Sequence, residues 1–533
     1  MKRDYFLHLG VALSLLFVGT PLRAQTTAQT PASSPAQAPT QADLAGTTKL
    51  TMQHAIEMAL ENNLDVVIAR LGYQAQGENV GRAKGAYNPL FRADFNNLRS
   101  RAPTGSQLAG ATTLTNFNTA YNFSWQQEIP TGGNYFIAFD NVRASTNNVF
   151  SLFNPSYRTG LSAQIAQPIL QNRQLNPIKQ QIVVAQNGER IARHQFEAEV
   201  MDLVSGVEQA YWDWVFSIRD LEVNQKSLQL ARDLLRNNQI QVEVGTMAPI
   251  DVLEAEAEVA ARENGVIVSE EAIARTTDEM RRLINDPSAS DFWGLQIEPA
   301  DDPQLSEVEI DLDEAVRTAL ARRPTIAESH VELDTRNFNV RYTKNQKLPQ
   351  VDLIGSYVLN GLGGDQIIRD EGFGGGIIGE IPGGYNDTLA QLFTNEFRDW
   401  SLGLVFSYPL GNSSADAAHA QAQADYRRQR AVLESQELVI AQQVRITARL
   451  VQTNRKRIES SRVAQELMFR RMEAEQKKFE VGMSTSFLIV QAQRDLSQAA
   501  ANDLRALIDF VKAIAAFERA KGTILDDSNI AIR

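Results

Sequence analysis

Residues 50–66 read LTMQHAIEMALENNLDV, and residues 310–326 read IDLDEAVRTALARRPTI. The apolar positions of the two stretches align at one constant offset: Leu50 with Ile310, Ala55 with Ala315, Ile56 with Val316 and Leu60 with Leu320. Both stretches have the helical spacing of apolar residues. The alignment therefore indicates an internal duplication.

A second matching pair lies further along each half. Residues 242–259 read VEVGTMAPIDVLEAEAEV, and residues 479–496 read FEVGMSTSFLIVQAQRDL. Because both pairs occur in the same order, we expect two tandem repeats. Their predicted boundaries are 49–290 and 310–533, with a linker at 291–309.

Each repeat is expected to begin with a helix of about 35 residues, at Thr51–Tyr87 and at Leu312–Lys347. A β segment follows, and then a helix of exceptional length, because no proline lies from Ile178 to Ala248 or from Leu410 to Arg533. In the second repeat, a seven-residue stripe predicts coiled-coil packing: Val444, Val451, Ile458, Met472 and Phe479, with Gln465 as its polar member. A helix of 65 residues is about 100 Å long, which suits a tube better than a compact domain.

Val244-Gly245 and Val481-Gly482 are expected to end the two long helices, since glycine is the usual residue just beyond a helix C-terminus. Return helices are predicted at about Ile250–Ile284 and Phe487–Lys521. Each repeat should therefore finish in a long helical hairpin.

Alternating sequences between the helices predict strands with one apolar face. The clearest has an apolar residue at every second position: Trp400, Leu402, Leu404, Phe406, Tyr408 and Leu410. Similar patterns run from Phe117 to Ile129 and from Tyr157 to Ile169. Thr131-Gly132-Gly133 resembles a hairpin turn, and the ten glycines within 361–384 predict a mobile external loop. An additional hairpin at about Tyr121–Arg143 either joins the sheet or extends outside it.

Composition limits the possible locations and functions. Lys2-Arg3, the apolar run Phe6–Val18 and Leu22-Arg23-Ala24 have the layout of a signal peptide, so we expect 1–24 to be removed on export. Residues 25–48 are rich in Thr, Ala, Gln, Ser and Pro and are expected to form a disordered leader. The chain has no cysteine, which excludes disulfides and thiol catalysis, and its net charge of −12 argues against nucleic acid as a partner.

No later stretch is apolar for 18 residues, so a membrane-spanning form would use β-strands closed into a barrel. No GxSxG, HExxH or Walker motif is present, and the five histidines are scattered. We therefore expect neither an enzyme nor a bound cofactor or metal. A soluble periplasmic coiled-coil structural protein is the alternative interpretation.

In their order and duplication, these segments resemble the TolC-like outer-membrane efflux protein family. The resemblance covers about Leu50 to Leu525 and is carried by the leader helices, the YNP and KLP strand starts, the QPIL and YPL strand ends, and the two VG turns. It implies an α+β membrane protein: a homotrimer whose shared transmembrane β-barrel continues into a long α-helical coiled-coil tunnel in the periplasm. It also implies a passive outer-membrane export channel for small molecules or proteins, working with a periplasmic adaptor and an inner-membrane transporter. One copy has too few strands to close a barrel alone.

The resemblance also suggests where function resides. The adaptor-docking tips would be Val244, Gly245, Thr246, Val481, Gly482 and Met483. The entrance gate would comprise Asp251, Glu254, Phe479 and Leu488; the two acids lie three residues apart at a helix start and would form carboxylate rings in a trimer. The belt in contact with outer-membrane lipid would include Trp125, Trp400, Phe406 and Tyr408.

Two further groups carry weaker signals. Ser484, Leu488 and Gln491 are uncharged where family members often carry charge, so an ion-pair lock at those positions is not expected, and packing around Phe479 and Leu488 is the alternative. Tyr211, Trp212 and Trp214 lie in the middle of a long helix and are expected to pack there rather than bind a ligand.

Overall fold

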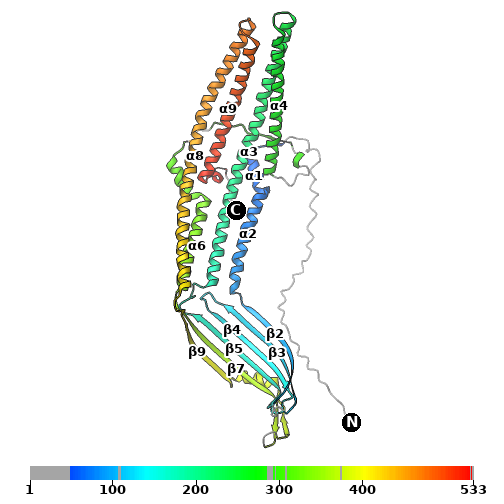
Figure 1. Cartoon of the computed structure of the whole chain (residues 1–533), viewed down its shortest axis with the longest axis vertical. Coiled ribbons are helices and arrows are strands. Elements are labelled where there is room, and N and C mark those ends of the chain that lie inside the picture. The colour runs from blue at the N-terminus through cyan, green and yellow to red at the C-terminus, as the bar shows by residue number, and fades with distance from the viewer. Residues whose placement is uncertain are drawn as a thin grey trace, which may run out of the picture. The chain divides into compact units, whose positions relative to one another are not determined.

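The computed structural model describes residues 48–105, 110–284, 292–294, 296–305, 309–371, 375–528 and 530. In the unit Thr48–Arg533, long helices run to one end and a sheet lies at the other (Figure 1). The predicted signal peptide 1–24 and the predicted leader, apart from Thr48, lie outside the described residues. Among those residues, no helix is both long enough and apolar enough to cross a bilayer.

The helices repeat in the same order in the two halves. The first half contains α1 (Met52–Asn62), α2 (Leu64–Lys84), α3 (Pro177–Glu243) and α4 (Pro249–Ile284). The second half contains α5 (Leu312–Arg322), α6 (Pro324–Gln346), α8 (Ser413–Glu480) and α9 (Ser486–Lys521). Among the described residues, the two short helices α7 (Tyr385–Thr394) and α10 (Ile524–Asp527) have no counterpart in the first half, and 3-10 turns lie at Gly85–Tyr87 and Phe292–Gly294.

The prediction of a single leader helix in each repeat was wrong, because both are broken after 11 residues. Asn63 is extended, and its side chain accepts a hydrogen bond from the backbone N–H of Asp65, so it caps a new helix. Arg323 precedes Pro324, whose ring disfavours helical geometry in the residue before it. Proline then suits the first position of α6.

The long helices and their return helices confirm the predicted hairpins. Helices α3 and α8 have 67 and 68 residues, which corresponds to about 100 Å each. The predicted stripe on α8 is buried at Val444, Val451, Ile458 and Met472. It packs against α9 and the leader helices, and the core there includes Ala319, Phe510 and Phe517.

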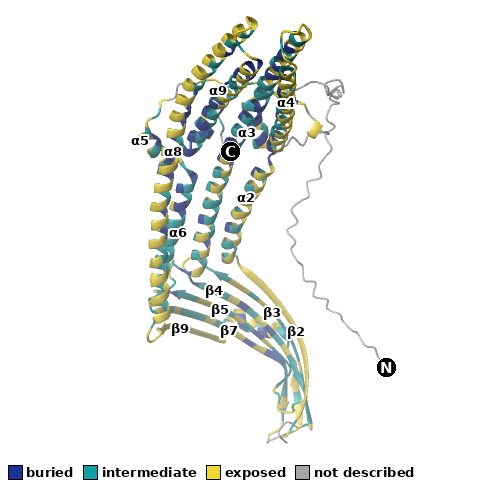
Figure 2. Ribbon diagram, turned by 45° about the horizontal axis from the view of Figure 1, so that its top comes forward, coloured by how far each residue is buried: buried dark blue, intermediate teal, exposed yellow. Residues whose placement is uncertain are grey.

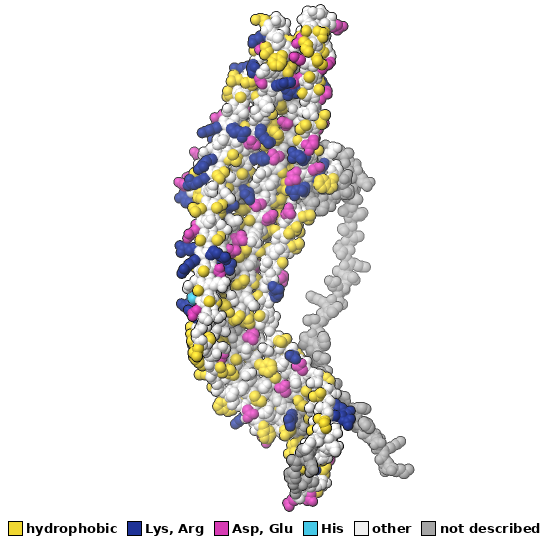
Figure 3. Space-filling view, in the orientation of Figure 1, with side chains coloured by type: hydrophobic (Ala, Val, Ile, Leu, Met, Phe, Trp, Pro, Cys, Tyr) yellow, Lys and Arg dark blue, Asp and Glu magenta, His cyan; other side chains and the backbone are white. Residues whose placement is uncertain are grey.

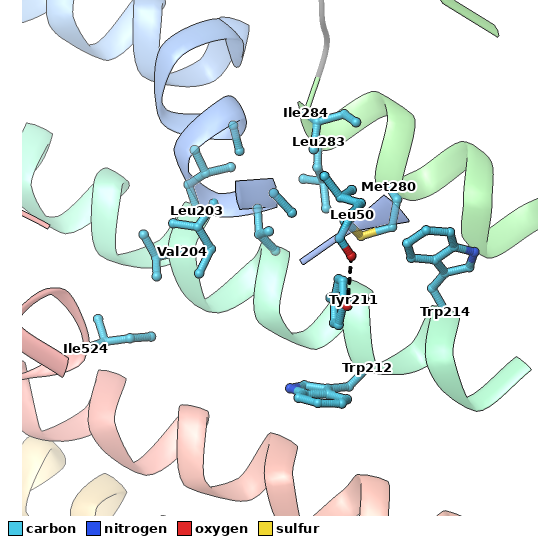
Figure 4. Close-up of a cluster of buried hydrophobic side chains, with 14 of the residues drawn as sticks. Leu50, Leu203, Val204, Tyr211, Trp212, Trp214, Met280, Leu283, Ile284 and Ile524 are labelled. Atoms are coloured by element: carbon cyan, nitrogen blue, oxygen red, sulfur yellow. Dashed lines mark hydrogen bonds between the residues drawn. The ribbon is translucent and has the colours of Figure 1, made fainter. Parts of the chain in front are cut away.

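A second core lies around Tyr211, as Figure 4 shows. Tyr211 and Trp214 are almost completely buried, and Trp212 is 6% exposed, so the expectation of packing rather than ligand binding agrees with their burial. The Tyr211 hydroxyl lies 3.0 Å from both the Leu50 carbonyl oxygen and an Asp301 carboxylate oxygen, and it accepts the Asp301 backbone N–H at 3.1 Å. Ile524, near the C-terminus, belongs to the same core.

The segment 291–309, which was assigned as a linker, contains a strand. There β6 (Ile297–Pro299) pairs in parallel with β1 (Thr48–Leu50). This small sheet forms because the Tyr211 hydroxyl bonds the backbone of both segments and holds them against α3.

The large sheet is antiparallel throughout. Its strands are β2 (Leu90–Pro103), β3 (Thr113–Glu128), β4 (Asn134–Thr146), β5 (Phe153–Pro168), β7 (Gln350–Arg369), β8 (Ile377–Ile381) and β9 (Arg398–Ser407). Their order is β2-β3-β4-β5-β7, and β8 and β9 both pair with β7. The additional hairpin is therefore β3–β4, within the sheet, and the predicted turn joins these strands, with Gly132 at φ +91°.

Two strand boundaries differ from expectation. Tyr408 and Leu410 lie beyond β9, because Pro409 has no N–H to continue the ladder. Much of the predicted glycine loop is strand, since β7 continues to Arg369 and β8 follows. Gly361 is needed there because a Cβ would stand 2.3 Å from the Thr388 carbonyl oxygen of the overlying α7.

Candidate functional site

The large sheet has one apolar face and one face of small and polar residues. A single row of directly paired residues crosses six strands on the apolar face: Phe91, Trp125, Ile137, Ala163, Tyr357 and Trp400. The neighbouring row on the other face is Arg92, Ser124, Ala138, Ser162, Val358 and Asp399. This alternation suits a wall with lipid on one side and water on the other.

The predicted belt residues lie on the apolar face and are exposed in a single chain. Trp400 is 72% exposed and Phe406 69% exposed, and Trp125 is also exposed. The Trp125 indole N–H donates to the Tyr135 hydroxyl at 3.4 Å. Tyr408 is exposed too, beyond the end of β9.

Helix α7 covers the apolar side of the sheet further from the long helices. The Tyr385 hydroxyl donates to the Asn141 side-chain oxygen at 2.7 Å, and the Thr159 hydroxyl donates to the Thr388 carbonyl oxygen at 3.4 Å. Asn141 and Thr388 are completely buried there. Over β5 and β7, the open apolar band is therefore confined to the part of the sheet nearer the helices.

The two predicted docking tips lie at the opposite end of the unit, where α3 meets α4 and α8 meets α9 (Figure 1). Gly245 has φ +76° and Gly482 has φ +74°, the left-handed geometry expected of glycine after a helix. The Thr246 and Met483 backbone N–H groups bond back to Gln241 and Lys478 carbonyls. Val244, Val481 and Met483 are at least 66% exposed and so present apolar surface to a partner.

The predicted acidic gate residues are in the first two turns of α4. Asp251 is half-buried and Glu254 is exposed. Asn238 of α3 donates to the Asp251 backbone oxygen at 3.2 Å and to the Ser486 hydroxyl of α9 at 2.7 Å. Asn238 thereby ties the acidic turn to the second hairpin.

The two apolar residues of the predicted gate have different surroundings within one chain. Phe479 packs against Leu234, Ile489 and Val490, as a helix ending beside its return helix requires. Leu488 is 41% exposed and is not part of that cluster. Within one chain, Phe479 therefore packs against Leu234 of α3 and against the two residues that follow Leu488.

The sequence analysis missed a buried carboxylate that joins the hairpins. Glu258 of α4 is 2% exposed and accepts hydrogen bonds from Arg262 at 2.7 Å and from Arg494 of α9 at 2.9 Å. Burial alone would raise the pKa of Glu258, but the hydrogen bonds from Arg494 and Arg262 outweigh it and hold the pKa below its usual range.

The sequence signal for this link was an acidic residue three positions after a small apolar residue, so that both lie on one face of the helix. Ala255 and Glu258 lie three residues apart on one face of α4, and both are buried. Ser484, where charge was absent, instead donates to Glu475 within its own hairpin. An ionic link between the hairpins thus exists, although not at the positions where the family resemblance would place one.

Comparison with known sequences identifies the family. The sequence pattern described as outer membrane efflux protein matches residues 55–286 and 315–523, one match in each repeat. The chain belongs to the outer membrane efflux protein family. Among curated proteins, none matches this sequence.

Solved structures show the same fold at low identity. The outer-membrane channel OprN has a TM-score of 0.64 at 16% identity, over 89% of this chain and 90% of that one. The outer-membrane channel CmeC of Campylobacter jejuni has a TM-score of 0.62 at 14% identity, over 89% and 86%. The outer-membrane channel MtrE of Neisseria gonorrhoeae has a TM-score of 0.60 at 16% identity, over 89% of both chains. The fold is that of outer-membrane channels with a periplasmic helical tunnel.

Proposed function

We propose that three copies of this chain form an outer-membrane channel for a tripartite efflux or type I secretion system. The sheets would form one barrel in contact with lipid, and the hairpins would form one tunnel through the periplasm. Small molecules or proteins would pass through it passively, driven by an inner-membrane transporter.

The observation that best supports this proposal is a sheet with one apolar and one polar face, joined directly to helical hairpins of about 100 Å. A soluble coiled-coil protein would have no use for an exposed row such as Phe91, Trp125 and Trp400. In Figure 3, charged side chains are dense over the helices and sparser over the visible side of the sheet. This distribution favours lipid around the sheet and water around the helices.

The two tips are the proposed contact with a periplasmic adaptor. Val481 and Met483 are 70% and 78% exposed on a turn held by backbone hydrogen bonds from Gly482 to Phe479 and from Met483 to Lys478. Exposed apolar side chains on a rigid turn can enter a partner's groove at low entropic cost.

The proposed gate lies just behind the tips. Opening requires the α3–α4 and α8–α9 hairpins to separate, so the contacts of Glu258 with Arg494 and of Asn238 with Ser486 would hold the closed state. Asp251 and Glu254 would form acidic rings that attract cations at the entrance. Unchanged conductance and cation preference in an Asp251→Ala channel would reject a gate role for that residue.

The main experiment measures channel formation. Protein extracted from the outer membrane should run as a heat-dissociable trimer and should conduct ions in planar lipid bilayers. A sample that stays monomeric and leaves bilayers sealed would overturn the proposal.

Docking is tested in cells that lack the chromosomal copy of this chain. Cells complemented with Met483→Asp should lose efflux of a fluorescent dye, while the outer-membrane trimer remains at the wild-type level. Glu371→Lys, an equally polar change at the sheet end of the chain, should restore efflux fully. Equal efflux by the two variants would reject the tips as the docking surface.

A further inference from the structure

The first half supplies two more full strands to the large sheet than the second half does. Strands β2, β3, β4 and β5 precede α3, whereas β7 and β9 are the only full-length strands among the described residues before α8. The difference is the hairpin β3–β4, which pairs on one side with β2 and on the other with β5. The hairpin therefore widens the wall of the sheet.

The sheet is six strands wide wherever β7 has a partner strand on its outer side. Strand β9 pairs with Gln350–Leu359 of β7, and β8 pairs with Gln366–Arg369, so β8 and β9 share one position at the edge. The two edges of the sheet are β2 and the β9–β8 position.

Both edge strands have an outer side that is not paired with another strand of the described chain. Every residue of β2 and of β9 is exposed, as Figure 2 shows, and no other described strand pairs with the outer side of either. Because each of the five steps across the sheet is antiparallel, β2 runs away from the helices and β9 runs toward them. One copy's β9 can therefore continue the antiparallel order with the next copy's β2.

We propose that β9 of each copy pairs with β2 of the next, which closes a barrel of 18 strands in the trimer. Three copies of a sheet six strands wide give this number, and an even number is what an antiparallel barrel requires. The proposal rests on the trimer of the proposed function. It adds which strands meet at the junction between neighbouring copies, here called the seam, and the width of the pore.

The tilt of the strands tests whether this closure is geometrically reasonable. A barrel of 18 strands tilted by about 35–45° needs a total stagger of roughly 18 to 26 residues, or about six to eight per copy. In the cross-sheet row, Phe91 is one residue from the helical end of β2, and Trp400 is seven residues from the helical end of β9. These two distances from the helical end differ by six residues, which lies within the six to eight residues of stagger that each copy must contribute.

The same stagger fixes the seam. Copies related by rotation place equivalent residues at equal height, so Phe91 should face residues near the helical end of the neighbouring β9. With a stagger of six or eight residues, its partner is Phe406 or Tyr408, and both lie on the apolar side. The lipid-facing band then continues across the seam without interruption.

The closed barrel would be wide. With strands about 4.8 Å apart and a tilt of about 40°, 18 strands give a backbone diameter of about 36 Å. Without the β3–β4 hairpin, 12 strands at the same tilt would give only about 24 Å. The outer-membrane opening would therefore suit bulky or folded cargo, and the narrowest point would be the periplasmic entrance.

Disulfide crosslinking tests the seam, and the absence of native cysteine simplifies it. The full-length chain would carry Phe91→Cys together with Phe406→Cys or with Tyr408→Cys, and each single variant is first checked for the heat-dissociable trimer. After mild oxidation in outer membranes, one of the two pairs should give covalently linked trimers on denaturing gels. The matched control Phe91→Cys with Val405→Cys places the second thiol on the opposite face and should stay uncrosslinked.

A third pair, Phe91→Cys with Ala163→Cys, tests the place of the hairpin. In the wide wall these residues are three strand spacings apart, about 14 Å, beyond the reach of a disulfide. A crosslink there would mean that β2 pairs directly with β5 and that the barrel has 12 strands. That result, or failure of both seam pairs in a sample that forms the trimer, overturns the proposal and leaves the proposed function standing. Absence of any trimer would overturn both.

Discussion

Neutralising Glu258 should open the channel at its periplasmic entrance. The carboxylate is buried on α4, and it accepts hydrogen bonds from Arg262 on its own helix and from Arg494 on α9. A Glu258→Gln variant has the same size, but it loses the charge that attracts Arg494. The contact between the hairpins should therefore weaken while their packing stays the same.

The size of the effect follows from exposure. Hydrogen bonds between charged groups are worth about 1 kcal/mol more than neutral ones, and Arg494 donates two of them to Glu258. The Arg494 side chain is 58% exposed, however, and solvent screening about halves their sum of about 2 kcal/mol. A loss of about 1 kcal/mol per chain is therefore a reasonable discounted value. If three chains open together, the loss of about 3 kcal/mol shifts the ratio of open to closed channels by roughly 150-fold.

The assay is the open probability of single channels in planar bilayers. Glu271→Gln is the matched control, because Glu271 lies on the same helix and faces Arg275 at 3.9 Å with both side chains mostly exposed. We expect Glu258→Gln to open far more often and Glu271→Gln to behave as wild type. If the two variants gate alike while both form trimers, Glu258 does not hold the entrance closed.

Three further predictions concern stability and the sheet. Burial raises the pKa of Glu208 to about 7, so the folded chain retains a proton that the unfolded chain releases above pH 4.5. The free energy of unfolding should therefore fall by up to about 3 kcal/mol as pH rises from about 4.5 to 7. Thermal denaturation of Glu208→Gln should lack this fall. Tyr211→Phe should cost about 1–3 kcal/mol, because the backbone N–H and the carboxylate of half-buried Asp301 both lose their hydrogen bond to the Tyr211 hydroxyl, and an unchanged melting temperature would contradict this. Gly361→Ala should push α7 off the sheet, because its Cβ would meet the Thr388 carbonyl, and so speed proteolysis within α7, whereas Gly403→Ala, with open space around its Cβ, should not.

Local periodicity was sufficient to predict the long elements. The stripe from Val444 to Met472 is buried as expected, because a seven-residue repeat leaves one face for packing whatever the neighbouring helix is. The left-handed glycines at 245 and 482 were equally predictable, since few other residues adopt that geometry.

Features that depend on contacts between distant segments could not be predicted in this way. The break at Asn63 has no proline to mark it, and its side chain also donates to the Leu283 carbonyl of α4. Glu258 looks like an ordinary surface acid until Arg494, 236 residues later, is placed beside it. The strand within glycine-rich 361–369 depends on pairing with β5 and on cover from α7.

The core around Tyr211 has a consequence for biogenesis. It gathers Leu50 from the start of the described chain, Ile297 from between the repeats, and Ile524 from close to the C-terminus. Although the sequence has the form of a duplication, the first copy cannot complete this core alone, because Ile524 comes from the second copy. The core around Tyr211 should therefore close only after most of the second copy has been synthesised.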